Sequence, residues 1–112
     1  MQTIPFEQFT AVELRVGTVM RAEEFPKARK PAYKLWVDFG PEFGVKQTSA
    51  QITVHYTPEA LIGKQVVGCL NLGSRNIGGF MSEFLCTGFP DDAGAIVLIS
   101  PDKPVPNGAK LF

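Results

Sequence analysis

Four cations gather in one short stretch of the sequence. Residues 27–34, KARKPAYK, hold Lys27, Arg29, Lys30 and Lys34 and no acidic residue, whereas residues 76–102 hold four acidic residues and no cation. The whole chain balances eleven Lys and Arg against eleven Asp and Glu, so bulk positive charge cannot attract nucleic acid. The local asymmetry predicts a cationic rim that neutralises phosphates. The alternative is a solvated loop whose lysines serve only solubility.

A second polar group follows a glycine-rich stretch. The segment NLGSRNIGGFMSEF, residues 71–84, contains three glycines, a single cation and two polar residues inside an apolar run. We expect residues 73–79 to form a rim loop longer than a tight hairpin, which presents its polar side chains to a ligand. Alternatively, Glu83 pairs with a nearby cation only to satisfy a half-buried carboxylate. The candidate nucleic-acid-binding residues are Lys27, Arg29, Lys30, Lys34, Lys46, Arg75, Ser82 and Glu83.

Aromatic side chains supply a second kind of candidate site. Trp36 follows Lys34 by two residues, so both lie on one mixed face of a predicted strand. Trp36 can stack a base, anchor an apolar peptide side chain, or pack against a second subunit. We take Trp36, Phe80 and Phe84 as candidate peptide-binding residues.

The sequence gives little support for a catalytic site, a metal site or a membrane-spanning segment. His55 is the one histidine, it has no partner at metal-ligand spacing, and Cys69 and Cys86 each lie in an apolar run typical of buried thiols. No phosphate-cradling loop or dinucleotide motif is present. The N-terminal residues show no secretory signal, and no apolar run has the length of a membrane span. We expect a cytoplasmic protein that is not an enzyme, needs no cofactor and does not insert into membranes.

The elements that position these residues are mostly strands. Alternation and turn residues predict strands at 13–25, 32–40, 45–52, 65–72 and 80–89, a short sixth strand at 95–100, and one helix at 57–64, which opens with Thr57 and Pro58. This order predicts an all-β fold, a five-stranded Greek-key OB barrel with one short helix between strands three and four. An SH3-like barrel or a small sandwich has similar strand lengths. We expect one domain, 1–112, with a barrel core at about 13–90.

The segment 80–89 is apolar on both of its predicted faces. Phe80, Phe84 and Cys86 share one face, and Met81, Leu85 and Phe89 share the other. A barrel covers only its inner face, so a peptide groove or a second subunit must cover the other. We therefore expect a homodimer, with the extensions 1–12 and 91–112 at its interface.

Several segments resemble a known family. ELRVGTV, YTPEALIGKQVVGCLNL and SRNIGGFMSE resemble the tRNA-binding OB domains that occur free-standing and appended to methionyl-tRNA synthetases. Residues 28–53 and the ending PDKPVPNGAKLF are more narrowly similar to the small bacterial chaperones of this family that are linked to protein export. The resemblance implies a homodimeric chaperone that binds unfolded or pre-export polypeptides, assists secretion beside the export machinery, and also binds tRNA. The alternative is a structure-specific tRNA-binding protein that assists translation.

Overall fold

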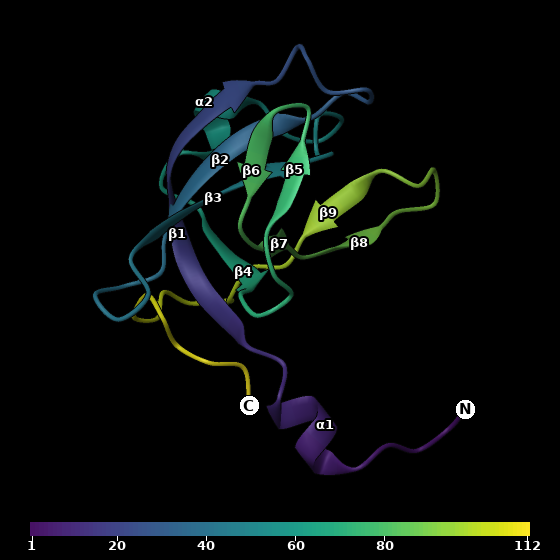
Figure 1. Cartoon of the computed structure of the whole chain (residues 1–112), viewed down its shortest axis with the longest axis vertical. Coiled ribbons are helices and arrows are strands. Elements are labelled where there is room, and N and C mark those ends of the chain that lie inside the picture. Colours follow the sequence, from purple (N-terminus) through teal and green to yellow (C-terminus); the bar gives the residue numbers. More distant parts are fainter.

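The computed structural model describes residues 1–112, and most of its regular structure is β-strand (Figure 1). Five strands form the main sheet, and two short hairpins and two short helices are attached to it. The elements are α1 (Phe6–Thr10), β1 (Leu14–Glu24), β2 (Tyr33–Asp38), β3 (Val45–Ala50), α2 (Pro58–Leu61), β4 (Gln65–Cys69), β5 (Arg75–Ile77), β6 (Phe80–Ser82), β7 (Leu85–Cys86), β8 (Gly88–Pro90) and β9 (Ile96–Leu98).

The main sheet has the strand order β3-β2-β1-β4-β7, and every neighbouring pair is antiparallel. The sheet curls into a nearly closed barrel with a short helix between β3 and β4, which confirms the predicted OB-type fold. The helix starts as the sequence predicts, because the Thr57 hydroxyl accepts a hydrogen bond from the Ala60 N–H (3.2 Å) and Pro58 opens the first turn.

The barrel interior is filled by alternate residues of the strands. Leu35 and Val37 of β2, and Phe39 directly after it, are fully buried. The Phe84 ring packs edge-on against the Phe39 ring, with 4.9 Å between their centroids. Gly68 lies between these rings, where an added Cβ would stand 2.8 Å from each of them. A side chain at residue 68 would therefore collide with the core.

The glycine-rich segment is not the long loop that the sequence suggested. Arg75 pairs with Ser82 and Ile77 with Phe80, so β5 and β6 form a hairpin with a two-residue turn. Gly78 and Gly79 occupy that turn with φ of +56° and +84°, the left-handed conformation that a tight primed turn requires. The expectation of a rim loop over residues 73–79 was wrong, because Gly78 and Gly79 form a tight turn between two paired strands.

The predicted strand 80–89 is also divided. Residues 80–82 pair back with β5, residues 85–86 pair with β4, and residues 88–90 pair with β9 in a second hairpin that projects from the barrel (Figure 1). Its apolar side chains therefore do not form two continuous faces. Phe84 turns into the core, while Leu85 stays exposed.

Side chains close the seam between β3 and the segment that follows β6. The Glu83 N–H donates to the Gln47 carbonyl (2.8 Å), and the Glu83 carboxylate accepts the Gln47 N–H (2.9 Å). The Ser82 hydroxyl lies 2.6 Å from the Thr48 hydroxyl and accepts the Ser49 N–H (3.3 Å). Ser82 and Glu83 thus hold the barrel closed, and the carboxylate is satisfied by a backbone N–H rather than by a cation.

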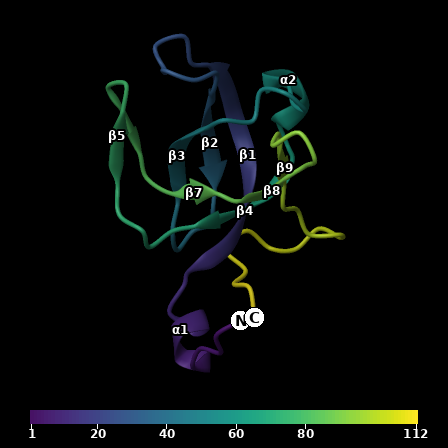
Figure 2. The same cartoon turned by 90° about the vertical axis from the view of Figure 1, so that its right-hand side faces the viewer.

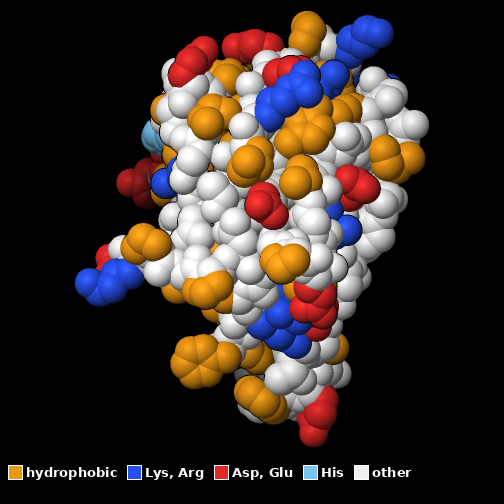
Figure 3. Space-filling model, turned by 90° about the vertical axis from the view of Figure 1, so that its left-hand side faces the viewer, with side chains coloured by type: hydrophobic (Ala, Val, Ile, Leu, Met, Phe, Trp, Pro, Cys, Tyr) orange, Lys and Arg blue, Asp and Glu red, His pale blue; other side chains and the backbone are white.

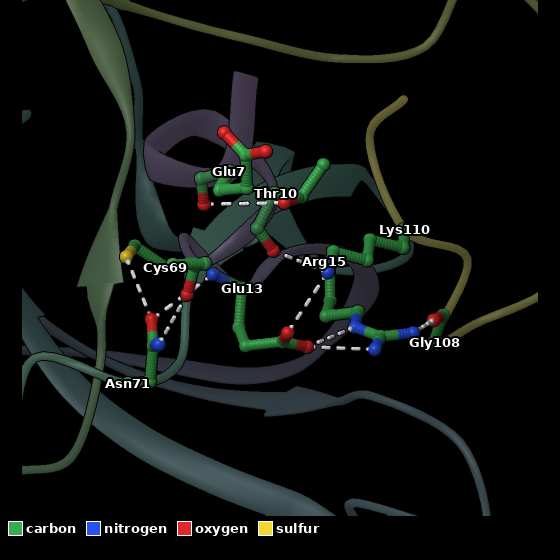
Figure 4. A network of polar contacts seen from close by, with 9 residues as sticks. Glu7, Thr10, Glu13, Arg15, Cys69, Asn71, Gly108 and Lys110 are labelled. Carbon is green, nitrogen blue, oxygen red and sulfur yellow. Dashed lines mark hydrogen bonds and ion pairs between the residues drawn. The ribbon is translucent and has the colours of Figure 1, made fainter. Parts of the chain in front are cut away.

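Both chain ends lie at the foot of the molecule, below the barrel, and Figure 1 shows that they are well apart there (Figures 1 and 2). A polar network joins the C-terminal tail to the residues at the start of β1 (Figure 4). The Glu13 carboxylate accepts hydrogen bonds from Arg15 (2.6 and 3.0 Å) and from Lys110 (3.0 Å), and Arg15 also donates to the Gly108 carbonyl (3.0 Å). These bonds, principally the one from Arg15, lower the pKa of Glu13. The network fixes the C-terminal tail against the start of β1.

Helix α1 was not predicted from the sequence. It has five residues, no side-chain cap at its N-terminus and no buried residue. Such a short helix carries almost no periodic signal and is marginal by itself, so the sequence offers little to detect.

Candidate functional site

A cleft of about 1200 Å³ opens beside the barrel seam. Its walls are the loop between β1 and β2, the end of β3, the β5 strand with the residues before it, and β7 with the residues after it. Its lining includes Lys27, Ala28, Arg29, Lys30, Ala32, Thr48, Ser49, Ala50, Gln51, Ile52, Leu72, Gly73, Arg75, Asn76, Ile77, Gly78, Ser82, Phe84, Leu85, Cys86, Thr87, Gly88 and Ile96. The tertiary structure thus brings the 27–30 loop and the hairpin, almost fifty residues apart in sequence, to one site.

The cleft is cationic. Lys27, Arg29 and Lys30 lie on one wall and Arg75 on another, and no Asp or Glu is among the lining residues. None of these four cations takes part in an ion pair. Four uncompensated cations around one opening attract a polyanion or an acidic chain.

The same cleft has an apolar component. Leu72 and Leu85 line it with 64% and 54% of their surface exposed, and Ile77 and Ile96 lie on the same lining. The only aromatic residue of the lining is Phe84, which is 5% exposed. The cleft therefore offers charge and aliphatic surface but no accessible ring on which a base could stack.

The aromatic candidates form a separate cluster outside the cleft. The Phe80 ring on β6 packs edge-on against Trp36 of β2 (5.8 Å between centroids) and against Phe25 (5.7 Å). The Arg21 guanidinium lies 4.3 Å from the centre of the Trp36 ring, and the Lys34 ammonium lies about 5 Å from both Phe rings. Stacked cations and rings stabilise one another, so this cluster fastens the β5–β6 hairpin to the barrel.

The predicted site residues therefore separate into groups. Lys27, Arg29, Lys30, Arg75 and Ser82 line the cleft, whereas Lys34, Lys46, Glu83, Trp36 and Phe80 do not. Phe84 borders the cleft but is buried in the core, so we leave it out of the peptide-binding surface. Leu72 and Leu85 were not predicted as site residues, because nothing in an apolar run shows which of its members stay exposed once the strands divide.

The other side chains that could react are His55, Cys69 and Cys86, and of these only Cys86 lines the cleft. His55 Nε2 lies 2.7 Å from Asp91 Oδ2, and this contact is the main reason that the pKa of Asp91 is lowered. Burial raises the pKa of the Cys86 thiol to about 12, so it is not a thiolate at neutral pH. No cluster of three His, Cys, Asp or Glu residues that could hold a metal ion is formed, and no helix is long and apolar enough to cross a membrane.

Exposed hydrophobic side chains also occur outside the cleft. One face of the molecule shows them in small groups among charged residues, and a group of them lies at the foot of the molecule near the termini (Figure 3). Phe6 of α1 and the C-terminal Phe112 are 71% and 107% exposed. The extensions thus carry apolar surface that this chain does not cover by itself.

An OB-type barrel with an open cleft places the chain in the class of OB-fold binding modules, members of which bind oligonucleotides or oligosaccharides. Within that class, the chain belongs to the family described as "Putative tRNA binding domain", whose model matches residues 14–110. The fold is very similar to that of the chaperone CsaA of Bacillus anthracis, with a TM-score of 0.92 and 48% identity over 99% of this chain and 100% of that one.

Two further proteins are similar to this chain. The CsaA chaperone protein of Picrophilus torridus matches with a TM-score of 0.90 and 35% identity, over 98% of this chain and 100% of that one. The methionine–tRNA ligase of Methanococcus aeolicus is 38% identical over 99% of this chain. The chain spans 16% of the length of that ligase.

Proposed function

We propose that this protein is a non-enzymatic chaperone that binds unfolded or pre-export polypeptides, and that it also binds tRNA, in both cases through the cleft. One observation carries the proposal: exposed aliphatic side chains and four uncompensated cations line the same opening. Aliphatic surface retains apolar segments of an unfolded chain, and the cations retain phosphates or acidic residues.

The polypeptide role has two supports. Leu72 and Leu85 are the kind of exposed aliphatic surface that takes up apolar segments, and the two CsaA structures, both titled as chaperones, match nearly the whole chain. Trp36 and Phe80 are proposed as a second apolar contact, next to the cleft rather than in it. The cytoplasm, where preproteins await export, is the proposed setting, with the export machinery as a further partner.

The tRNA role follows from the family and from the charge. Without an accessible aromatic ring, the cleft cannot gain the stacking energy that single-strand binders take from each base. Its cations can contact phosphates regardless of sequence. We therefore propose that tRNA is recognised by the shape and charge of its backbone.

A homodimer is part of the proposal. Several apolar side chains of the extensions 1–12 and 91–112, including Phe6 and Phe112, are exposed, and the Glu13 network holds the C-terminal tail in a fixed position. A second copy that covers these extensions would remove the apolar surface from water and place two clefts in one particle.

A second function is favoured by a specific observation. The methionine–tRNA ligase similarity spans 99% of this chain, and the cleft contains no acid that would repel RNA. The chain would then be a structure-specific tRNA-binding protein that assists translation, without a polypeptide client.

The two functions are separated by measuring aggregation of a chemically unfolded client and anisotropy of labelled tRNA on the same preparation. We expect the protein to suppress aggregation and excess tRNA to abolish that suppression, because both ligands occupy one cleft. Tight tRNA binding without any protection of the client would leave only the translation role.

Variants matched in side-chain exposure can identify the residues that contact the client polypeptide. Leu72→Ser with Leu85→Ser should weaken protection, whereas Val54→Ser with Ile62→Ser removes comparably exposed side chains outside the cleft and should not. Trp36→Ala tests the second contact. If only Trp36→Ala reduces protection while the mass of the particle stays unchanged, the client binds at the aromatic cluster instead of the cleft.

A further inference from the structure

The backbone hydrogen bonds along the outer edge of β3 end where the chain enters the cleft. Gln47 and Ser49 direct their backbone groups away from β2, toward the seam, where Glu83 and Ser82 bind them. Gln51 directly follows Ala50, the last residue of β3, at the position where this alternation would continue. It is exposed and lines the cleft, and neither its N–H nor its carbonyl makes a hydrogen bond. One backbone donor and one backbone acceptor, immediately beyond the end of β3, are thus left free.

The opposite wall presents a similar edge. Thr87 donates its N–H to the Val67 carbonyl (3.0 Å), and Leu85 lies opposite Cys69, so these residues of the 85–87 segment face β4. Cys86, between them, directs its N–H and carbonyl away from β4, and no strand pairs with that edge. The cleft therefore lies between two sheet edges.

The two edges run in the same direction. Strands β3 and β1 are both antiparallel to β2, and strands β7 and β1 are both antiparallel to β4. Strands β3 and β7 are therefore parallel to each other, and a chain laid between them in the reverse direction is antiparallel to both. Antiparallel pairing is the slightly more stable arrangement.

We infer that an extended segment of client polypeptide binds in the cleft as an additional β-strand, hydrogen-bonded to the free edge at Gln51 with its other edge toward Cys86. This inference rests on the proposed polypeptide-binding function and adds the chemical group that is recognised, the peptide backbone itself. A free N–H and a free carbonyl on one residue match a peptide unit, which both donates and accepts. Phosphate oxygens could satisfy only the donor.

Backbone pairing also accounts for a broad choice of clients. Every unfolded chain offers the same N–H and carbonyl groups, so affinity does not require a particular sequence. The aliphatic residues Leu72 and Leu85 and the cations then modulate affinity by side-chain contacts. Ala28, Ala32 and Ala50, which also line the cleft, occupy little of it.

The test uses backbone N-methylation, which removes N–H donors without changing any side chain. A fluorescein-labelled nine-residue peptide of alternating Val and Asp is compared with two copies, one N-methylated at the Val residues and one at the Asp residues. Alternation fixes which side chains face the apolar wall, because a slip by one residue would reverse the two faces. One methylated copy should bind the wild-type protein at least about tenfold more weakly than the parent, since it loses its paired donors.

The outcomes separate the inference from the proposed function. Equal binding of all three peptides would overturn strand addition and leave capture by side chains. Failure of all three peptides, and of an unfolded client, to bind would overturn the proposed polypeptide function itself.

Amide hydrogen exchange supplies a second readout on the unmodified protein. The exposed Gln51 amide should exchange rapidly in the free protein and be protected when the parent peptide is bound. Unchanged exchange at Gln51 with the peptide bound would refute the site. Protection by labelled tRNA, but not by the peptide, would assign this edge to RNA.

Discussion

The cationic wall of the cleft gives a quantitative prediction for tRNA binding. If all four cations contact phosphates, the slope of log affinity against log salt is about −2.8 for single-stranded and about −3.6 for duplex contacts. Affinity should then fall about 50- to 150-fold between 50 and 200 mM salt. The double variant Arg29→Ala, Lys30→Ala retains two cations, so its slope halves and the same change of salt costs only about 7- to 12-fold.

The assay is fluorescence anisotropy of labelled tRNA over a salt series. The matched control is Lys64→Ala with Lys103→Ala, which removes the same charge from positions outside the cleft. The control should retain nearly the full slope. Equal loss of slope in the two double variants would show that net charge, and not the cleft, attracts the RNA, and an unchanged slope in the Arg29, Lys30 variant would refute the site.

Three further predictions concern the assembly and the barrel. Light scattering at micromolar concentration should give about twice the chain mass of 12.2 kDa, and deletion of residues 104–112 should cause aggregation; a monomeric full-length protein would contradict the dimer. Gly68→Ala should destabilise the barrel by about 1–3 kcal/mol in denaturant titration, because the new Cβ meets the Phe39 ring, and an unchanged midpoint would show that the core yields freely. Because the hydrogen bond from Arg15 lowers the pKa of Glu13 in the folded state, its stabilisation is present above the unfolded pKa of about 4.5 and disappears as pH falls through the folded value. The difference in unfolding free energy between wild type and Glu13→Gln should therefore shrink in acid, and a difference that stays constant down to pH 3 would exclude the ionised pair as its source.

Local sequence signals were sufficient wherever neighbouring residues decide the structure. Alternating side chains located β1, β2 and β3, and Thr57 with Pro58 located α2, because strand faces and helix caps depend on residues a few positions apart. The order of these elements was enough to indicate an OB barrel. The cations at residues 27–30 do line one cleft with Arg75, and their role in binding stays a prediction.

The division of the predicted fifth strand could not be read from the sequence. Residues 80–89 form one apolar run, yet Phe80 packs outside the barrel, Phe84 inside it and Leu85 at the cleft. The position of each of these side chains depends on a packing partner distant in sequence, such as Trp36 or Phe39. The short-range pattern is the same for all three residues, so periodicity alone could not separate them.

The sequence by itself determined the strand-rich barrel, the cap and start of α2, and the local separation of charge, because each follows from the chemistry of adjacent residues. The tertiary structure decided which charges and apolar side chains share a surface. It brought Arg75 and the 27–30 loop to one cleft, used Ser82 and Glu83 to close the seam, and left the backbone of Gln51 unpaired. Those outcomes depend on how a curled sheet brings its two edges together, and that geometry is set by the packing of the whole barrel rather than by any short segment.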